Sequence, residues 1–130
     1  METNEIILSK GMYGLLKTHL KTNNKLTAFN KAKLEKELKD ARILVSNAIP
    51  DDVVSVNRNV KVIDLQTKEE LVFDLVPPGE AKISNNKVSV LSPVGVALLG
   101  YREGNDVEWD MPEGFKSFKI QKVSAISLQN

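Results

Sequence analysis

The most informative stretch of the chain is VLSPVGVALLG, residues 90–100, which indicates the end of a strand followed by a short helix. Ser92 is a favourable N-cap residue, and Pro93 falls at the first helical position, where its missing N–H costs nothing. Gly100 stands where a left-handed residue would end the helix after about two turns. Beyond it, DVEWDM at residues 106–111 alternates as a half-buried strand does, and a Pro-x-Gly turn follows.

The composition is that of a globular protein with a single small core. The 130 residues are 42% hydrophobic and 27% charged, which fits one domain or a small domain with an appendage. No apolar run approaches the roughly 20 residues of a membrane-spanning helix, and the acidic start METNE lacks the basic region of a signal peptide. The absence of cysteine excludes disulfides, thiol catalysis and cysteine-ligated zinc, and it fits a cytoplasmic location.

Charge divides the chain into two parts. Residues 6–34 contain six lysines and no Asp or Glu, whereas residues 50–113 contain twelve acidic and six basic residues. We therefore expect a basic N-terminal arm at residues 1–49 and an acidic body at residues 50–130.

The arm has the pattern of two helices. Ser9 can cap a first helix that runs to about Lys21, and a second helix is expected to begin near Thr27 or Ala28 and end near Ser46. Apolar residues of the second helix follow coiled-coil spacing at Leu34, Leu38, Ala41 and Val45. A short polar turn between the helices predicts an antiparallel hairpin, whose second helix would be about 28 Å long.

The body has the pattern of an α+β domain with short antiparallel strands and one brief helix. The expected strands are residues 53–57, 60–65, 71–76, 87–91, 106–111 and 116–123. Alternation places Trp109 in the core, and it leaves a solvated outer face at Asp106, Glu108 and Asp110. His19, the only histidine, is expected to be a partly buried packing residue, because it follows helical spacing beside leucines.

The run from Ser92 to Gly114 resembles the C-terminal domain of the Gre-type transcription elongation factors. A Ser-Pro helix, a Gly-Asp pair and a Pro-x-Gly hairpin occur there in the same order. The resemblance covers about residues 51–123, and it implies a fold like that of FK506-binding proteins. It also implies docking on bacterial RNA polymerase beside the secondary channel.

In Gre factors the N-terminal coiled coil carries acidic residues that help hold a catalytic metal in the polymerase. The arm of this chain is shorter, and its tip, KTNNKLT at residues 21–27, has no carboxylate. Magnesium binds oxygen ligands and usually one or two carboxylates. We therefore expect no transcript cleavage, no catalytic or metal-binding residues, and no cofactor.

A short acid-free hairpin on a Gre-type domain resembles the Rnk proteins, which are named as regulators of nucleoside diphosphate kinase. The segment PDDVVSVNRNVK, residues 50–61, is similar to theirs. Rnk proteins bind RNA polymerase, can exclude Gre factors and do not stimulate cleavage. The resemblance implies that the polymerase is contacted by Leu91, Ser92, Pro93, Val94 and Gly95, with an arm tip at Asn23, Asn24 and Lys25. It implies indirect contact with nucleic acid, no small-molecule ligand and no membrane partner.

Two other interpretations remain open. The implied fold makes a peptidyl-prolyl isomerase the enzyme alternative, although the aromatic residues of the body follow no recognisable pocket pattern. The lysines of the arm could instead follow a nucleic-acid backbone, which would make the chain a nucleic-acid-binding module. Lysines spread over two helices usually form a solvated face, and no interleaved aromatic residues favour base stacking.

Overall fold

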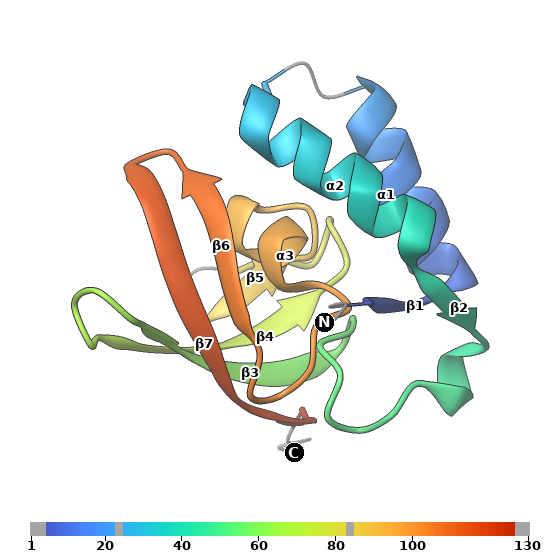
Figure 1. The fold of residues 1–130 in the computed structure, drawn as a ribbon. Helices are drawn as coiled ribbons and strands as arrows, with labels where there is room; N and C mark the ends of the chain where they lie inside the picture. The colour runs from blue at the N-terminus through green and yellow to red at the C-terminus, as the bar shows by residue number, and fades with distance from the viewer. Residues whose placement is uncertain (1–4, 23–24, 83–84, 127–130) are drawn as a thin grey trace.

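The computed structural model describes residues 5–22, 25–82 and 85–126. It is a two-helix hairpin beside a curled sheet, which confirms the expected α+β class (Figure 1). The elements are, in order, β1 Ile7–Ser9, α1 Lys10–Thr22, α2 Ala28–Asp40, β2 Arg42–Leu44, the 3₁₀ helix η1 Ser46–Ala48, β3 Arg58–Asp64, β4 Glu70–Val76, β5 Lys87–Ser89, α3 Pro93–Leu98, β6 Asp106–Met111 and β7 Gly114–Ala125. Within these described residues, no helix combines the length and apolarity needed to cross a membrane.

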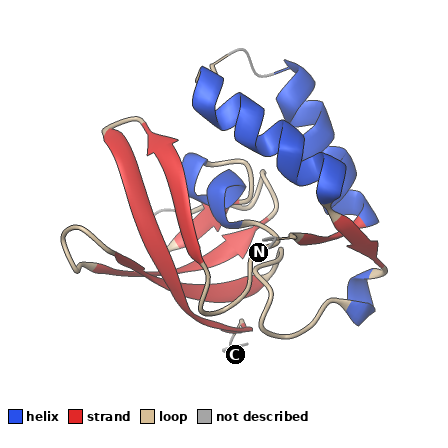
Figure 2. Cartoon of the chain, in the orientation of Figure 1, coloured by secondary structure: helices blue, strands red, loops and turns tan. Residues whose placement is uncertain are grey.

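The main sheet has the strand order β5-β4-β3-β7-β6, and β6 therefore lies at one edge. Its pairs are antiparallel except for β4 and β5, which run parallel. The sheet curls around α3, as the coloured elements in Figure 2 show. A second, two-stranded parallel sheet joins β1 to β2 at the base of the hairpin.

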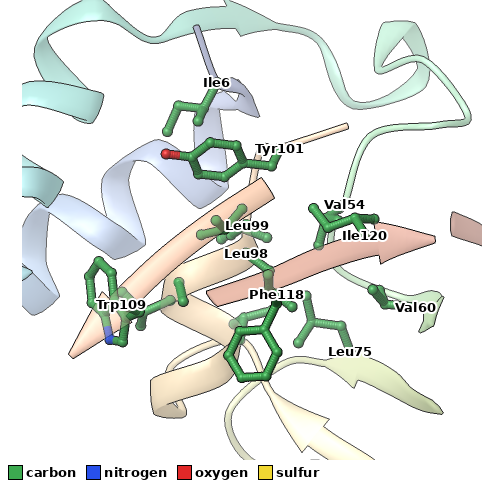
Figure 3. Packing of buried hydrophobic residues seen from close by; sticks show 14 of the residues in the cluster. Ile6, Val54, Val60, Leu75, Leu98, Leu99, Tyr101, Trp109, Phe118 and Ile120 are labelled. Carbon is green, nitrogen blue, oxygen red and sulfur yellow. The ribbon is translucent and has the colours of Figure 1, made fainter. Parts of the chain in front are cut away.

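One hydrophobic core serves both the sheet and the hairpin. Leu98 of α3 packs with residues of the sheet such as Leu75, Phe118 and Ile120 (Figure 3). Trp109 is only 2% exposed, which confirms its expected place in the core. Leu16 of α1 and Leu34 of α2 belong to the same cluster. The apolar side of the hairpin is therefore continuous with the core of the body.

The first helix begins as predicted, because the backbone N–H of Met12 donates to Ser9 Oγ at 3.2 Å. The second helix is shorter than predicted: it ends at Asp40, and Ala41 is already extended. The next residues pair with β1, where the backbone N–H of Arg42 donates to the Ile6 carbonyl at 2.9 Å. The expected seam therefore extends beyond the helix only to Ala41, which still packs against the core, and its last member, Val45, is 69% exposed.

The strand expected at residues 53–57 is also wrong. Only Val53 makes an isolated bridge, to Arg102, and Asn57 has a positive φ of 63°. The Arg58 guanidinium holds this segment as a loop, because it donates to the carbonyls of Pro50 at 2.6 Å and Val53 at 2.7 Å. The remaining predicted strands are confirmed, with ends that differ by a few residues.

Candidate functional site

The start of α3 is held by a compact set of serine hydrogen bonds. The backbone N–H of Gly95 donates to Ser92 Oγ at 3.1 Å, so Ser92 is the predicted N-cap. The Ser92 hydroxyl in turn donates to the Ser89 carbonyl at 2.7 Å, and Ser89 Oγ accepts from the backbone N–H of Leu91 at 3.0 Å. Pro93 follows at the first helical position and is exposed. The turn into α3 is therefore fixed before any partner binds.

Two glycines allow α3 to lie this close to its neighbours. A Cβ at Gly95 would lie 2.4 Å from the Ser89 carbonyl oxygen, so only glycine fits there. Gly100 has a φ of +93°, as the left-handed position after the helix requires, and a Cβ there would lie 2.7 Å from Ile6 Cβ.

The five residues expected to contact a partner differ in exposure. Pro93 is exposed, Leu91, Ser92 and Val94 are half-buried, and Gly95 is buried.

Leu91 and Pro93 line a cleft of about 500 Å³ between the body and the tip of the hairpin. We call this the hairpin–α3 cleft. Its body wall is formed by Leu91, Pro93, Val96, Trp109, Asp110, Met111 and Pro112. Its hairpin wall is formed by His19, Lys25, Leu26, Thr27 and Asn30. The structure thus brings the predicted contact residues of α3 together with Lys25 of the predicted arm tip, whereas Asn23 and Asn24 lie outside the described residues.

The hairpin wall is attached to β6 through Asn30. Its Nδ2 donates to the Asp110 carbonyl at 2.8 Å, and its Oδ1 accepts from the Asp110 backbone N–H at 2.9 Å. Thr27 caps α2 at the same end, because its Oγ1 accepts from the backbone N–H of Asn30 at 3.2 Å. Beside this pair, the rings of Phe29 and Phe115 meet edge to face with centroids 5.0 Å apart. These contacts hold the start of α2 against the edge strand of the sheet.

Sequence reasoning did not identify Asn30 as a site residue. The available signal was its spacing, because it precedes Leu34 and Leu38 by four and eight residues and shares their helix face. A polar residue within an apolar seam is a common device for fixing orientation. Asn30 is 4% exposed, and both ends of its amide are bonded.

A second attachment joins the middle of α2 to the residue after Gly100. Lys33 Nζ lies 2.7 Å from Glu37 Oε2 and 2.9 Å from the Tyr101 hydroxyl, which itself donates to Glu37. Burial, together with the negative charge of Glu37, raises the pKa of Tyr101 far above its usual range. Tyr101 is therefore protonated and able to donate at neutral pH.

The charges around the cleft are basic on the hairpin side. Lys25 is exposed, and the pKa of His19 is lowered by partial burial, which confirms its expected packing position.

Among the described residues, no group of three or more His, Asp or Glu side chains is arranged to hold a metal ion. On the outer face of β6, Asp106 pairs with Lys119 at 3.1 Å, and Glu108 is exposed.

A second cavity, of about 430 Å³, lies between β4 and the β6–β7 hairpin and was not expected from the sequence. Its lining is largely apolar and includes Phe73 and Phe118. At one side Lys116 Nζ lies 3.1 Å from Asp64 Oδ2. The pKa of Asp64 is lowered first by the backbone N–H of Gln66 and then by Lys116. The Asp64 carboxylate also stabilises the turn between β3 and β4, because it accepts a hydrogen bond from the backbone N–H of Gln66.

Comparison with known proteins identifies the family of the chain. The family model "Transcription elongation factor, GreA/GreB, C-term" matches residues 49–125. The chain therefore belongs to the GreA/GreB transcription elongation factor family. It is 40% identical over 92 residues to the transcription elongation factor GreA of Clostridium acetobutylicum, and the match covers 71% of this chain. The same match covers 58% of the relative, so the chain spans little more than half the length of that relative.

Solved structures agree with this assignment. A prokaryotic transcription elongation factor GreA/GreB from Nitrosomonas europaea is 32% identical, with a TM-score of 0.67, and the match covers 94% of this chain and 99% of that one. The GreA factor homolog 1 of Thermus thermophilus is 24% identical, with a TM-score of 0.50, and the match covers 93% and 99% of the two chains. The second likeness is one of fold.

Proposed function

We propose that this chain is a transcription regulator that binds bacterial RNA polymerase beside its secondary channel and competes there with Gre factors. In this proposal it supplies no transcript-cleavage chemistry and has no enzymatic activity of its own. Membership of the GreA/GreB family and the well-formed Ser92–Pro93 helix start support the docking part of the proposal. Such a regulator would act in the cytoplasm.

The observation that carries the proposal is the short hairpin without acidic residues at its tip. Each helix has 13 residues and is therefore about 20 Å long. Residues 6–34 contain no carboxylate, and magnesium sites in polymerase-type enzymes depend on carboxylate oxygens. Glu37, which lies further along α2, is already bonded to Lys33 and Tyr101. The tip of the hairpin therefore lacks the carboxylate that a cleavage factor would deliver.

Within the family, we place the chain with the Rnk-type proteins. The short hairpin and the similarity of residues 50–61 support this finer assignment. The hairpin is also joined to the body through Asn30 and through Tyr101. A hairpin held in this way would stay at the channel entrance, where it would obstruct a Gre factor.

Binding to purified core RNA polymerase tests the proposal. The wild-type chain is expected to bind, and a Ser92→Arg variant is expected to bind at least about tenfold more weakly, because a long charged side chain would separate α3 from its partner. Ser92→Thr is the matched control, since threonine retains the capping hydroxyl. Backtracked elongation complexes with labelled RNA should yield no short 3′ fragments from the chain alone. Failure of the wild-type chain to bind, or release of such fragments, would contradict the proposal.

A further inference from the structure

We propose that the cavity between β4 and the β6–β7 hairpin is a binding site for a small organic amine, which has an aromatic or branched aliphatic body and an ammonium group at one end. We call this space the β4–β7 cavity, and its volume is about 430 Å³. Of the described residues that line it, only Met111 also lines the hairpin–α3 cleft, and the two-helix hairpin contributes none. The inference therefore concerns a separate site and does not depend on polymerase binding.

The walls of the β4–β7 cavity suit an apolar body. Its volume lies in the range of sites that enclose small organic ligands. Phe73 and Phe118 are almost completely buried, whereas Leu71 is 38% exposed to solvent. The apolar lining residues come from five elements of the body and include Leu71, Phe73, Val88, Val94, Met111 and Phe118. A ligand that covered Leu71 would remove apolar surface from water, which favours binding.

The central strand of the sheet fixes the two aromatic walls before any ligand binds. Phe73 of β4 pairs with Val60 of β3, and Phe118 of β7 pairs with Asp64 of the same strand. Both aromatic residues are thus held by regular backbone pairing on either side of β3. A cavity formed in advance loses little conformational entropy when a ligand enters it.

The charges around the cavity favour a cation. Four charged side chains line it, and they are Asp64, Glu69, Glu113 and Lys116. Lys116 Nζ lies 3.1 Å from Asp64 Oδ2, so these two charges offset each other. Glu69 and Glu113 are exposed, and within the described part of the chain neither forms an ion pair. Two carboxylates therefore remain to pair with a cationic group.

The influence of both glutamates reaches the existing ammonium group of the cavity. The pKa of Lys116 is raised first by its hydrogen bond to Asp64 and also by the negative charges of Glu113 and Glu69. A ligand ammonium near these side chains would be stabilised by the same charges. At this exposed position it would stay hydrated while the apolar body entered the cavity, so no charge would be buried.

An amine fits this site better than an anion or a metal ion does. Lys116 is already bonded to Asp64, and Glu69 and Glu113 would repel a phosphate or a carboxylate. Among the residues that the structure describes, no group of three or more His, Asp or Glu side chains is arranged to hold a metal ion. Apolar walls with two unpaired carboxylates instead match a molecule that is apolar at one end and cationic at the other.

Nuclear magnetic resonance titration of the isotope-labelled chain with three matched probes tests the inference. Phenethylamine carries the expected ammonium group, phenethyl alcohol replaces it by a neutral group, and hydrocinnamate carries the opposite charge. The amine should shift the backbone amide signals of Phe73, Val88 and Phe118. It should bind about fivefold more tightly than the alcohol, because it can pair with two carboxylates, and hydrocinnamate should bind more weakly than the alcohol.

Substitutions by glutamine separate the charged part of the site from its apolar part. Glu69→Gln combined with Glu113→Gln should lower the preference for the amine over the alcohol to about one. Glu35→Gln combined with Glu108→Gln changes the net charge equally, at exposed positions that do not line the cavity, and should keep the preference at about fivefold. Leu71→Gln should weaken the binding of both probes by about threefold, because it removes apolar surface from the wall. Circular dichroism checks that each variant folds.

The other outcomes would overturn the inference. Equal binding of amine and alcohol by the wild-type chain would contradict it, as would signal shifts confined to residues outside the cavity. Loss of the preference in both double variants would reduce the effect to net charge. Tighter binding of a Phe-Lys dipeptide, capped at both ends, than of phenethylamine would assign the cavity to a basic protein segment instead of a small amine. None of these outcomes would change the proposed function, which is tested separately by polymerase binding.

Discussion

The side chain of Asn30 pairs with the backbone of Asp110 as a neighbouring strand would, donating at 2.8 Å and accepting at 2.9 Å. Asp110 lies on β6, the edge strand of the main sheet. Edge strands carry unpaired backbone groups, and here one amide side chain satisfies a donor and an acceptor together. One buried polar residue of α2 therefore contributes to the orientation of the hairpin, together with the contacts at Tyr101 and Phe115.

Replacing Asn30 should release this attachment. Asn30→Leu would leave the N–H and the carbonyl of Asp110 without partners beside an apolar residue, which is expected to lower the free energy of unfolding by about 1 to 3 kcal/mol. Urea denaturation measures this change. Asn30→Asp keeps the acceptor but buries a charge and turns a second carboxylate oxygen toward the Asp110 carbonyl, so its loss should be at least as large as that of the leucine variant. Wild-type stability in Asn30→Leu would show that the pair does not hold the hairpin.

The Tyr101 hydroxyl should make stability sensitive to alkaline pH. The folded state raises the pKa of Tyr101 above its ordinary value of 10.0, through burial and then the charge of Glu37. The stabilisation is therefore fully present below about pH 10 and is lost as pH rises above it, because the unfolded chain ionises first. Between about pH 8 and pH 11, the free energy of unfolding should fall more in the wild-type chain than in Tyr101→Phe. If the free energy of unfolding fell equally in the two proteins, Tyr101 would not be the source of the alkaline pH dependence.

The two ends of α3 could be predicted because the residues that set them lie within a few positions of the helix. Ser92 caps the backbone N–H of Gly95, and Gly100 supplies the positive φ after the helix. The end of α2 was not predictable in this way. The apolar spacing continues to Val45, but pairing of Arg42–Leu44 with β1 stops the helix at Asp40. A parallel pair between segments more than thirty residues apart leaves little trace in local periodicity.

The cleft was harder to predict than the helix that borders it. Ser92 and Pro93 stand out from their own neighbours in the sequence. The opposite wall depends on the hydrogen bonds from Asn30 to Asp110, which join residues separated by 80 positions. The aromatic contact between Phe29 and Phe115 likewise joins the hairpin to the sheet. Neither contact follows from periodicity, since each requires the orientation of the hairpin that it helps to set.

Two glycine substitutions should change stability in opposite directions. Gly95→Ala places a Cβ 2.4 Å from the Ser89 carbonyl oxygen, so the backbone must shift and the free energy of unfolding should fall by about 1 to 3 kcal/mol. Gly14→Ala on α1 meets nothing within 4 Å and should raise it by about 0.5 to 1 kcal/mol, because alanine favours helix. Thermal unfolding measures both changes. A tolerated Gly95→Ala would contradict the close packing of α3 against the end of β5.

Competition with a Gre factor tests the central claim most directly. A stalled, backtracked elongation complex with labelled RNA is given a fixed amount of Gre factor and increasing amounts of this chain. Wild-type protein should reduce the short 3′ fragments toward the level without Gre factor, and Ser92→Arg should require at least about tenfold more protein for the same reduction. Unchanged Gre cleavage at saturating wild-type protein would contradict the claim that the two proteins share a docking site.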